Sequence, residues 1–140
     1  MASKIFLDAN IILDFTLKRE SYEVSKKIIA LVVHREYEAF ITPAVIHIVG
    51  YWLTKAYGVE KAKELLLTLL SDIQVIDISH SITLNALHSK IRDIEDALQY
   101  YTALHHQLDY FISRDKRLQK DGIPALPVYT PEQFVKLFSL

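Results

Sequence analysis

Two aspartates follow short apolar runs, in positions where a carboxylate can do chemistry. Asp8 comes directly after the run 5–7, and Asp115 comes soon after the run 110–113. A carboxylate beside a buried segment is costly unless it is paired, hydrogen-bonded or bound to a cation. Open parallel α/β sheets bind their ligands just outside the carboxyl ends of the strands. If both runs are parallel strands, the two acids share one rim of the sheet.

A second group of acids lies at the start of a predicted helix. Asp93 and Asp96 are three residues apart, so their carboxylates share one helix face. The chain has no cysteine, and His105 and His106 are adjacent, which suits a metal pair poorly. Oxygen-only sites favour Mg²⁺ or Mn²⁺ over zinc. The acids from three elements therefore predict a site for a hard divalent cation.

Each acid also has a purely structural interpretation. Asp93 and Asp96 can be the N-cap and a first-turn acid of a helix. Asp8 can cap the helix that follows its strand, and Asp115 can begin a turn. Asp77 also follows a predicted strand, so a place at the rim does not by itself single out Asp8 and Asp115.

Basic residues surround the second of these strand-end acids. Arg114, Lys116, Arg117 and Lys120 flank Asp115, where a phosphodiester backbone needs countercharge. They are equally compatible with a solvated turn. Because the net charge is −1, any nucleic-acid contact has to come from such a local basic surface.

Composition indicates one ordinary globular domain. The 140 residues are 51% hydrophobic and 24% charged, and no apolar run approaches the roughly 18 residues of a membrane span. The absence of cysteine excludes disulfides and thiolate chemistry. We therefore expect a protein of the cytoplasm with no membrane segment.

Apolar periodicity predicts strands that alternate with helices. The predicted strands are 4–7, 39–41, 73–76, 110–113 and 126–129. The predicted helices are 21–33, 43–57, 59–70, 81–91, 94–108 and one that opens with the capping box at 130–133. This alternation is typical of an α/β fold whose parallel sheet is covered on both faces.

Three segments resemble the signature blocks of PIN-domain proteins, many of which are ribonuclease toxins of VapBC-type toxin–antitoxin pairs. The segments are 6–14, 93–98 and 112–116, and the closing stretch 122–134 is similar as well. The resemblance covers nearly the whole chain, so residues 1–140 are expected to form one PIN domain. It implies an α/β/α sandwich with a five-stranded parallel sheet of order 3-2-1-4-5.

The resemblance also implies an activity, which is Mg²⁺- or Mn²⁺-dependent hydrolysis of single-stranded RNA. It implies homodimers and, for a toxin, an antitoxin protein as partner. By the same resemblance, Asp8, Asp96 and Asp115 are the catalytic, metal-binding acids. Asn10 and Ser113 are supporting hydrogen-bonding residues, and Asp93 is a possible additional acid. Arg114, Lys116 and Arg117 are the candidate RNA-binding residues.

One position departs from the family pattern. PIN domains usually carry a glutamate early in the helix after the second strand, and Ile48 stands at the aligned position. No acid occurs from Ala39 to Tyr57. The resemblance is thus compatible with a weak nuclease, with one that uses Asp93 instead, or with a domain that has lost catalysis and binds RNA or protein.

Two other enzyme and signalling classes fit less well. A phosphatase of the haloacid dehalogenase type needs a second aspartate two residues after the first, and Asn10 stands there. A receiver domain needs paired acids before its phosphorylated aspartate and a lysine at a later strand end, which this chain does not provide.

Overall fold

The computed structural model, which describes residues 2–138, is built on a five-stranded parallel sheet. The strands are β1 (Ser3–Leu7), β2 (Tyr37–Ile41), β3 (Ile73–Val75), β4 (Tyr110–Ile112) and β5 (Val128–Tyr129). Their order is β3-β2-β1-β4-β5, as predicted. Because β1 and β4 are neighbours with Leu7 opposite Ile112, the residues that follow these strands emerge side by side.

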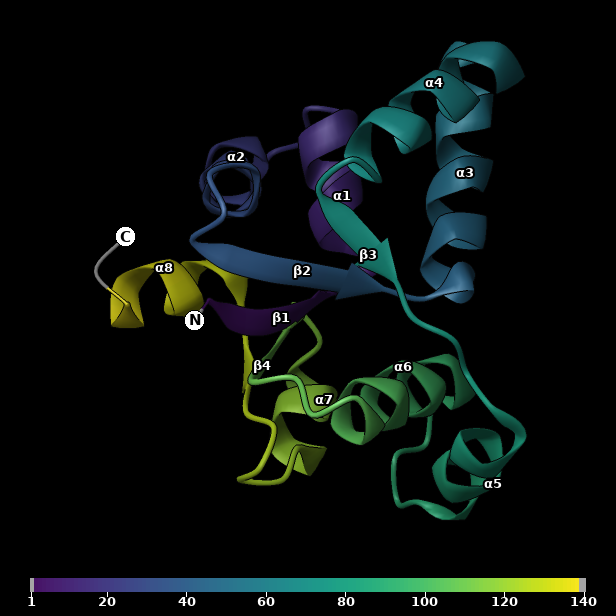
Figure 1. Ribbon diagram of the computed structural model, residues 1–140, viewed down its shortest axis with the longest axis vertical. Coiled ribbons are helices and arrows are strands. Elements are labelled where there is room, and N and C mark those ends of the chain that lie inside the picture. The colour runs from purple at the N-terminus through teal and green to yellow at the C-terminus, as the bar shows by residue number, and fades with distance from the viewer. Residues whose placement is uncertain (1, 139–140) are drawn as a thin grey trace.

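Eight helices cover the sheet within the described residues. They are α1 (Ala9–Thr16), α2 (Tyr22–Val33), α3 (Pro43–Tyr57), α4 (Val59–Leu69), α5 (His80–His88), α6 (Ile94–His105), α7 (Lys116–Asp121) and α8 (Pro131–Leu137). Figure 1 shows α1 to α4 on one side of the sheet and α5 to α7 on the other. The result is the expected sandwich, with α8 packed beside α2.

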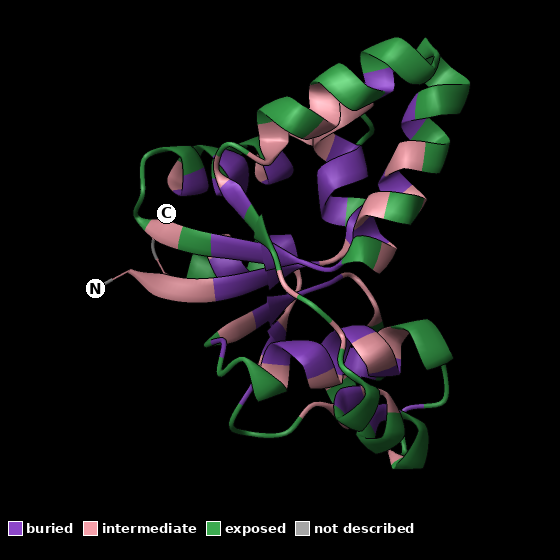
Figure 2. Cartoon of the chain, turned by 45° about the vertical axis from the view of Figure 1, so that its right-hand side comes forward, coloured by how far each residue is buried: buried purple, intermediate pink, exposed green. Residues whose placement is uncertain are grey.

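The core lies around the carboxyl-terminal parts of the central strands, where consecutive residues are all buried (Figure 2). Phe6 of β1 and Phe111 of β4 stack with their ring centroids 4.7 Å apart. Tyr100 of α6 is also fully buried, and its hydroxyl donates to the carbonyl of Leu126. These contacts fix the two central strands against the helical layer that carries α6.

Local signals set most helix boundaries as the sequence predicts. Thr42 caps α3 with Pro43 at its first position, and Gly58 ends it at a φ of 88°, which glycine adopts without strain. Thr130 and Gln133 form both hydrogen bonds of the capping box of α8.

Two helices end earlier than predicted. α5 stops at His88, because the hydroxyl of Ser89 bonds to the backbone of Ala86 and Ile91. α6 stops at His105, because Gln107 takes a positive φ of 58°. In both cases the apolar pattern runs on into the following loop, which explains the error. No helix within residues 2–138 is long and apolar enough to cross a membrane.

Candidate active site

Three helices begin at the same rim of the sheet, each capped by one of the predicted acids. Asp8 accepts a hydrogen bond of 2.8 Å from the backbone N–H of Ala9 in α1. Asp93 caps α6 by accepting 2.9 Å from Asp96 N–H. Asp115 caps α7, accepting from the N–H groups of the second and third helix residues at 2.9 and 3.2 Å. The three acids therefore do cap helices, and the caps place them at the same rim of the sheet.

The acids line one cleft of about 360 Å³. Asp8, Asp93, Asp96 and Asp115 all contribute to its wall, together with Glu95, which the sequence reasoning did not single out. The remaining lining residues are Ala9, Asn10, Ile48 and Arg114. Asp77 lies outside this cleft at the exposed edge of the sheet, after β3.

Ser113 joins two of the acids. Its buried hydroxyl donates 2.8 Å to Asp8 Oδ2 and accepts 3.1 Å from the backbone N–H of Asp115. The hydroxyl thus holds the carboxylate of Asp8 in place from the neighbouring strand end. Asn10, the other expected supporting residue, is exposed, and its amide oxygen makes only a long contact of 3.5 Å with Arg19.

Burial and the closeness of the other acids shift the pKa values of three carboxyl groups in the cleft. Burial raises the pKa of Asp8, while the hydrogen bonds from Ser113 and Ala9 oppose the rise. Burial, a hydrogen bond to Asp115 and the neighbouring negative charges raise the pKa of Asp96 to about 8. Burial also acts to raise the pKa of Asp115, but hydrogen bonds from Asp96 and from backbone N–H groups outweigh it and lower that pKa. The pKa values of these two neighbouring carboxyls are therefore shifted in opposite directions, upward for Asp96 and downward for Asp115.

The five carboxylates of the cleft suit a hard divalent cation, because such cations prefer oxygen ligands. In the part of the chain that the structure describes, no three acidic or histidine side chains are arranged to hold one ion as they stand. Asp96 and Asp115 bond to each other instead. An ion shared by Asp8, Asp96 and Asp115 requires these side chains to turn from their present positions.

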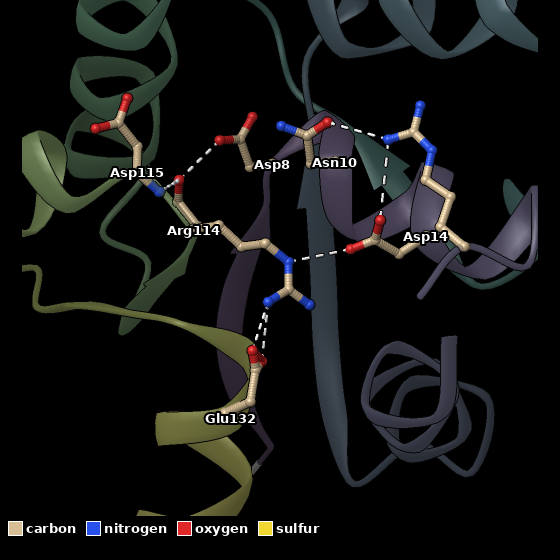
Figure 3. A network of polar contacts seen from close by, with 8 residues as sticks. Asp8, Asn10, Asp14, Arg114, Asp115 and Glu132 are labelled. Carbon is tan, nitrogen blue, oxygen red and sulfur yellow. Dashed lines mark hydrogen bonds and ion pairs between the residues drawn. The ribbon is translucent and has the colours of Figure 1, made fainter. Parts of the chain in front are cut away.

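A charged network that the sequence reasoning missed lies beside the cleft. Asp14 of α1 is buried, and the guanidinium of Arg114 donates 3.1 Å to its carboxylate. The same guanidinium binds Glu132 of α8, as Figure 3 shows. Arg19 also lies 3.9 Å from Asp14. Arg114, which follows β4, therefore connects α1 and α8, and two of its three guanidinium nitrogens are engaged within the protein.

The other two expected RNA-binding residues are exposed. Lys116 and Arg117 form the first turn of α7. Lys116 also opens onto a groove of about 710 Å³ between α7, β5 and α8, which Lys120 and Lys136 line as well. This groove is a local basic surface next to the acidic cleft.

Comparison with known proteins identifies the family. The family model of the PIN domain matches residues 4–117, which is most of the chain and includes every acid of the cleft. The chain belongs to the PIN-domain family. It is 26% identical over 141 residues to Ribonuclease VapC1 of Aquifex aeolicus, covering 95% of this chain and 94% of that protein.

Solved structures agree with this fold. A toxin–antitoxin complex from Klebsiella pneumoniae has a chain that matches with a TM-score of 0.66 at 25% identity, covering 91% of this chain and 97% of that one. PAE2754 from Pyrobaculum aerophilum matches with a TM-score of 0.69 at 18% identity, covering 100% and 98%. The sheet order of this PIN domain is thus that of its structural neighbours.

Ile48 lies between the acidic cleft and the hydrophobic core of this PIN domain. It lines the acidic cleft, and it is also partly buried against the core. Val45, Val49 and Leu53 of α3 are the fully buried residues. Trp52, four residues after Ile48 in the same helix, is 44% exposed.

Proposed function

We propose that this PIN domain is a ribonuclease that cleaves single-stranded RNA with Mg²⁺ or Mn²⁺, and that it is the toxin of a toxin–antitoxin pair. The observation that carries the proposal is the convergence of Asp8, Asp96 and Asp115 on one cleft at the carboxyl rim of the sheet. The similarity over 95% of the chain to a protein named as a ribonuclease supports it.

The metal-binding residues in this proposal are Asp8, Asp96 and Asp115. A bound divalent ion supplies an activated water and neutralises charge that develops on the phosphate. Ser113 orients Asp8 through its 2.8 Å hydrogen bond. Asp93 and Asn10 border the same cleft and act as supporting polar groups there.

Substrate binding falls to the basic residues of α7. Lys116 and Arg117 are exposed and next to the acids, so they can neutralise the phosphates on either side of the cleaved bond. Arg114 also borders the cleft, but its guanidinium is already engaged in ion pairs with Asp14 and Glu132. Its contribution to RNA binding is therefore smaller than that of Lys116 and Arg117.

A second function, binding without turnover, is favoured by Ile48. An isoleucine side chain at the cleft can neither hold a metal nor orient a water, and no acid elsewhere in α3 replaces it. In this alternative the domain binds RNA or protein through the same surfaces.

Exposed apolar side chains support the partner part of the proposal. Tyr51, Trp52 and Tyr57 of α3 and Val59 and Leu67 of α4 are all exposed. Large apolar groups gathered on one helical hairpin are typical of protein-binding surfaces. We assign this surface to the antitoxin and to a second copy of the chain, and we place the complex in the cytoplasm.

RNA cleavage by the purified protein tests the activity. Labelled single-stranded RNA is incubated with the wild type and with Asp8→Asn, in Mn²⁺ and in EDTA. We expect cleavage only by the wild type with Mn²⁺. RNA retention on the wild type without cleavage under any condition supports the binding module instead. Cleavage that persists in Asp8→Asn or in EDTA contradicts the proposed site.

A further inference from the structure

A smaller cavity of about 160 Å³ adjoins the acidic cleft. The two share Asp93, Asp96 and Asp115 in their walls, so the cavity opens beside the proposed reaction centre. α6 and α7, which begin at these acids, lie on the same side of the sheet (Figure 1).

Three further charged side chains line the cavity, beside the acids that it shares with the cleft. Arg92 precedes α6, and Arg117 and Asp121 belong to α7. Within residues 2–138 none of the three forms an ion pair. Arg117 lies in the first turn of α7 and Asp121 at its end, so both charges interact unfavourably with the helix dipole. The two residues are four positions apart with the base before the acid, which is the weaker order for an ion pair along a helix. Helix stability therefore does not explain these two residues.

The floor of the cavity is apolar. Ile91 and Leu118 are both buried and contribute to its lining. A cavity with an apolar floor and charged groups around it suits a flat ring whose faces are apolar and whose edges carry hydrogen-bonding groups. A phosphate suits it poorly, because four carboxylates line the cavity and repel anions.

We propose that this cavity receives a guanine base of the RNA whose cleavage is proposed above. Guanine offers two neighbouring acceptors, O6 and N7, which match one arginine fork. It also offers two neighbouring donors, N1–H and the amino group, which match the two oxygens of one carboxylate. Arg92 binds the first edge and Asp121 the second, which leaves Arg117 for the phosphates. Among the four RNA bases only guanine presents both pairs.

Binding of nucleosides tests this inference without relying on catalysis. Guanosine, adenosine, cytidine and uridine are titrated separately into the ¹⁵N-labelled full chain, and amide chemical shifts are followed. We expect guanosine to shift the amides of Arg92, Arg117 and Asp121 and to bind about tenfold more tightly than the other three, as one bidentate base contact predicts. Equal binding of all four, or guanosine shifts outside this cavity, overturns the proposal.

Two variants make the test specific. Asp121→Asn removes one carboxylate oxygen and adds a donor, so it should abolish the preference for guanosine. The fold should remain, because the change also removes an acid from a helix C-terminus. Lys90→Ala, at an exposed residue outside the cavity, is the matched control and should leave the preference unchanged. RNA cleavage that is normal and indifferent to guanine would refute the base pocket alone, whereas guanosine binding without RNA cleavage would refute the nuclease alone.

Discussion

Ser113 donates a hydrogen bond of 2.8 Å to the carboxylate of Asp8 across the boundary between β4 and β1. This contact pairs residues 105 positions apart in the chain. It exists because β1 and β4 run parallel as neighbours, so that the two side chains leave the sheet at the same level. The nuclease proposal depends on this placement of Asp8.

Ser113→Ala should weaken both stability and metal binding. The substitution leaves Asp8 Oδ2 and the N–H of Asp115 without their shared partner, at a cost of roughly 1–3 kcal/mol in the free energy of unfolding. It also raises the pKa of Asp8 further, because the hydroxyl now lowers that pKa. We expect about a tenfold loss of Mn²⁺ affinity by calorimetry. Ser71→Ala, at an exposed serine, is the control and should change neither quantity measurably.

Asp96→Asn should make the metal-free protein less sensitive to pH. The pKa of Asp96 is raised to about 8, so the folded state binds more protons than the unfolded state between about pH 4 and pH 8. Its contribution to stability is complete below pH 4 and is lost as the pH rises toward 8. Urea unfolding at pH 5 and pH 8 should show a smaller fall in stability for the variant, and calorimetry a weaker affinity for Mn²⁺. An unchanged affinity for Mn²⁺ would mean that Asp96 only stabilises the first turn of α6.

Arg114→Ala should destabilise the fold by roughly 1–3 kcal/mol, because it leaves the buried carboxylate of Asp14 with only the more distant Arg19. Thermal unfolding measures the effect. Arg35→Ala removes a solvent-exposed ion pair with Asp72 and should cost less than about 0.5 kcal/mol. If the two variants were equally stable, the network around Asp14 would have no structural role.

Ile48→Glu tests the missing glutamate. Because Ile48 lines the cleft, the new carboxylate can face the other acids, and Mn²⁺ should then raise the melting temperature of the variant more than that of the wild type. RNA cleavage should increase in the same preparation. Val49→Glu, one residue further in the buried part of α3, should prevent folding. A collapse of Ile48→Glu as complete as that of Val49→Glu would mean that Ile48 belongs to the core.

The sequence predicts the fold well because its signals are local. Apolar runs, proline at the start of α3 and the capping box of α8 each act within a few residues, and each appears in the structure. The strand order came from the family resemblance, since periodicity alone does not say which strands are neighbours. The ends of α5 and α6 were missed because they depend on a side-chain hydrogen bond at Ser89 and on the positive φ of Gln107.

The sequence predicts which acids line the cleft better than it predicts the contacts between them. Acids after strands indicated a shared rim, but they did not show that Asp96 bonds to Asp115 or that Glu95 joins the lining. The ion pairs of Arg114 were also missed, because they join residues 100 and 18 positions apart. Such contacts follow from packing between elements, for which a single sequence carries no direct signal.

The most direct test of the metal-site assignment is a crystal structure of the protein grown with Mn²⁺, with anomalous scattering recorded at the manganese edge. We predict a manganese peak bound by oxygens of Asp8, Asp96 and Asp115 at about 2.0–2.3 Å. The hydrogen bond between Asp96 and Asp115 should be open in that structure. No peak at this cleft, with Asp96 and Asp115 still bonded to each other at saturating Mn²⁺, would contradict the assignment.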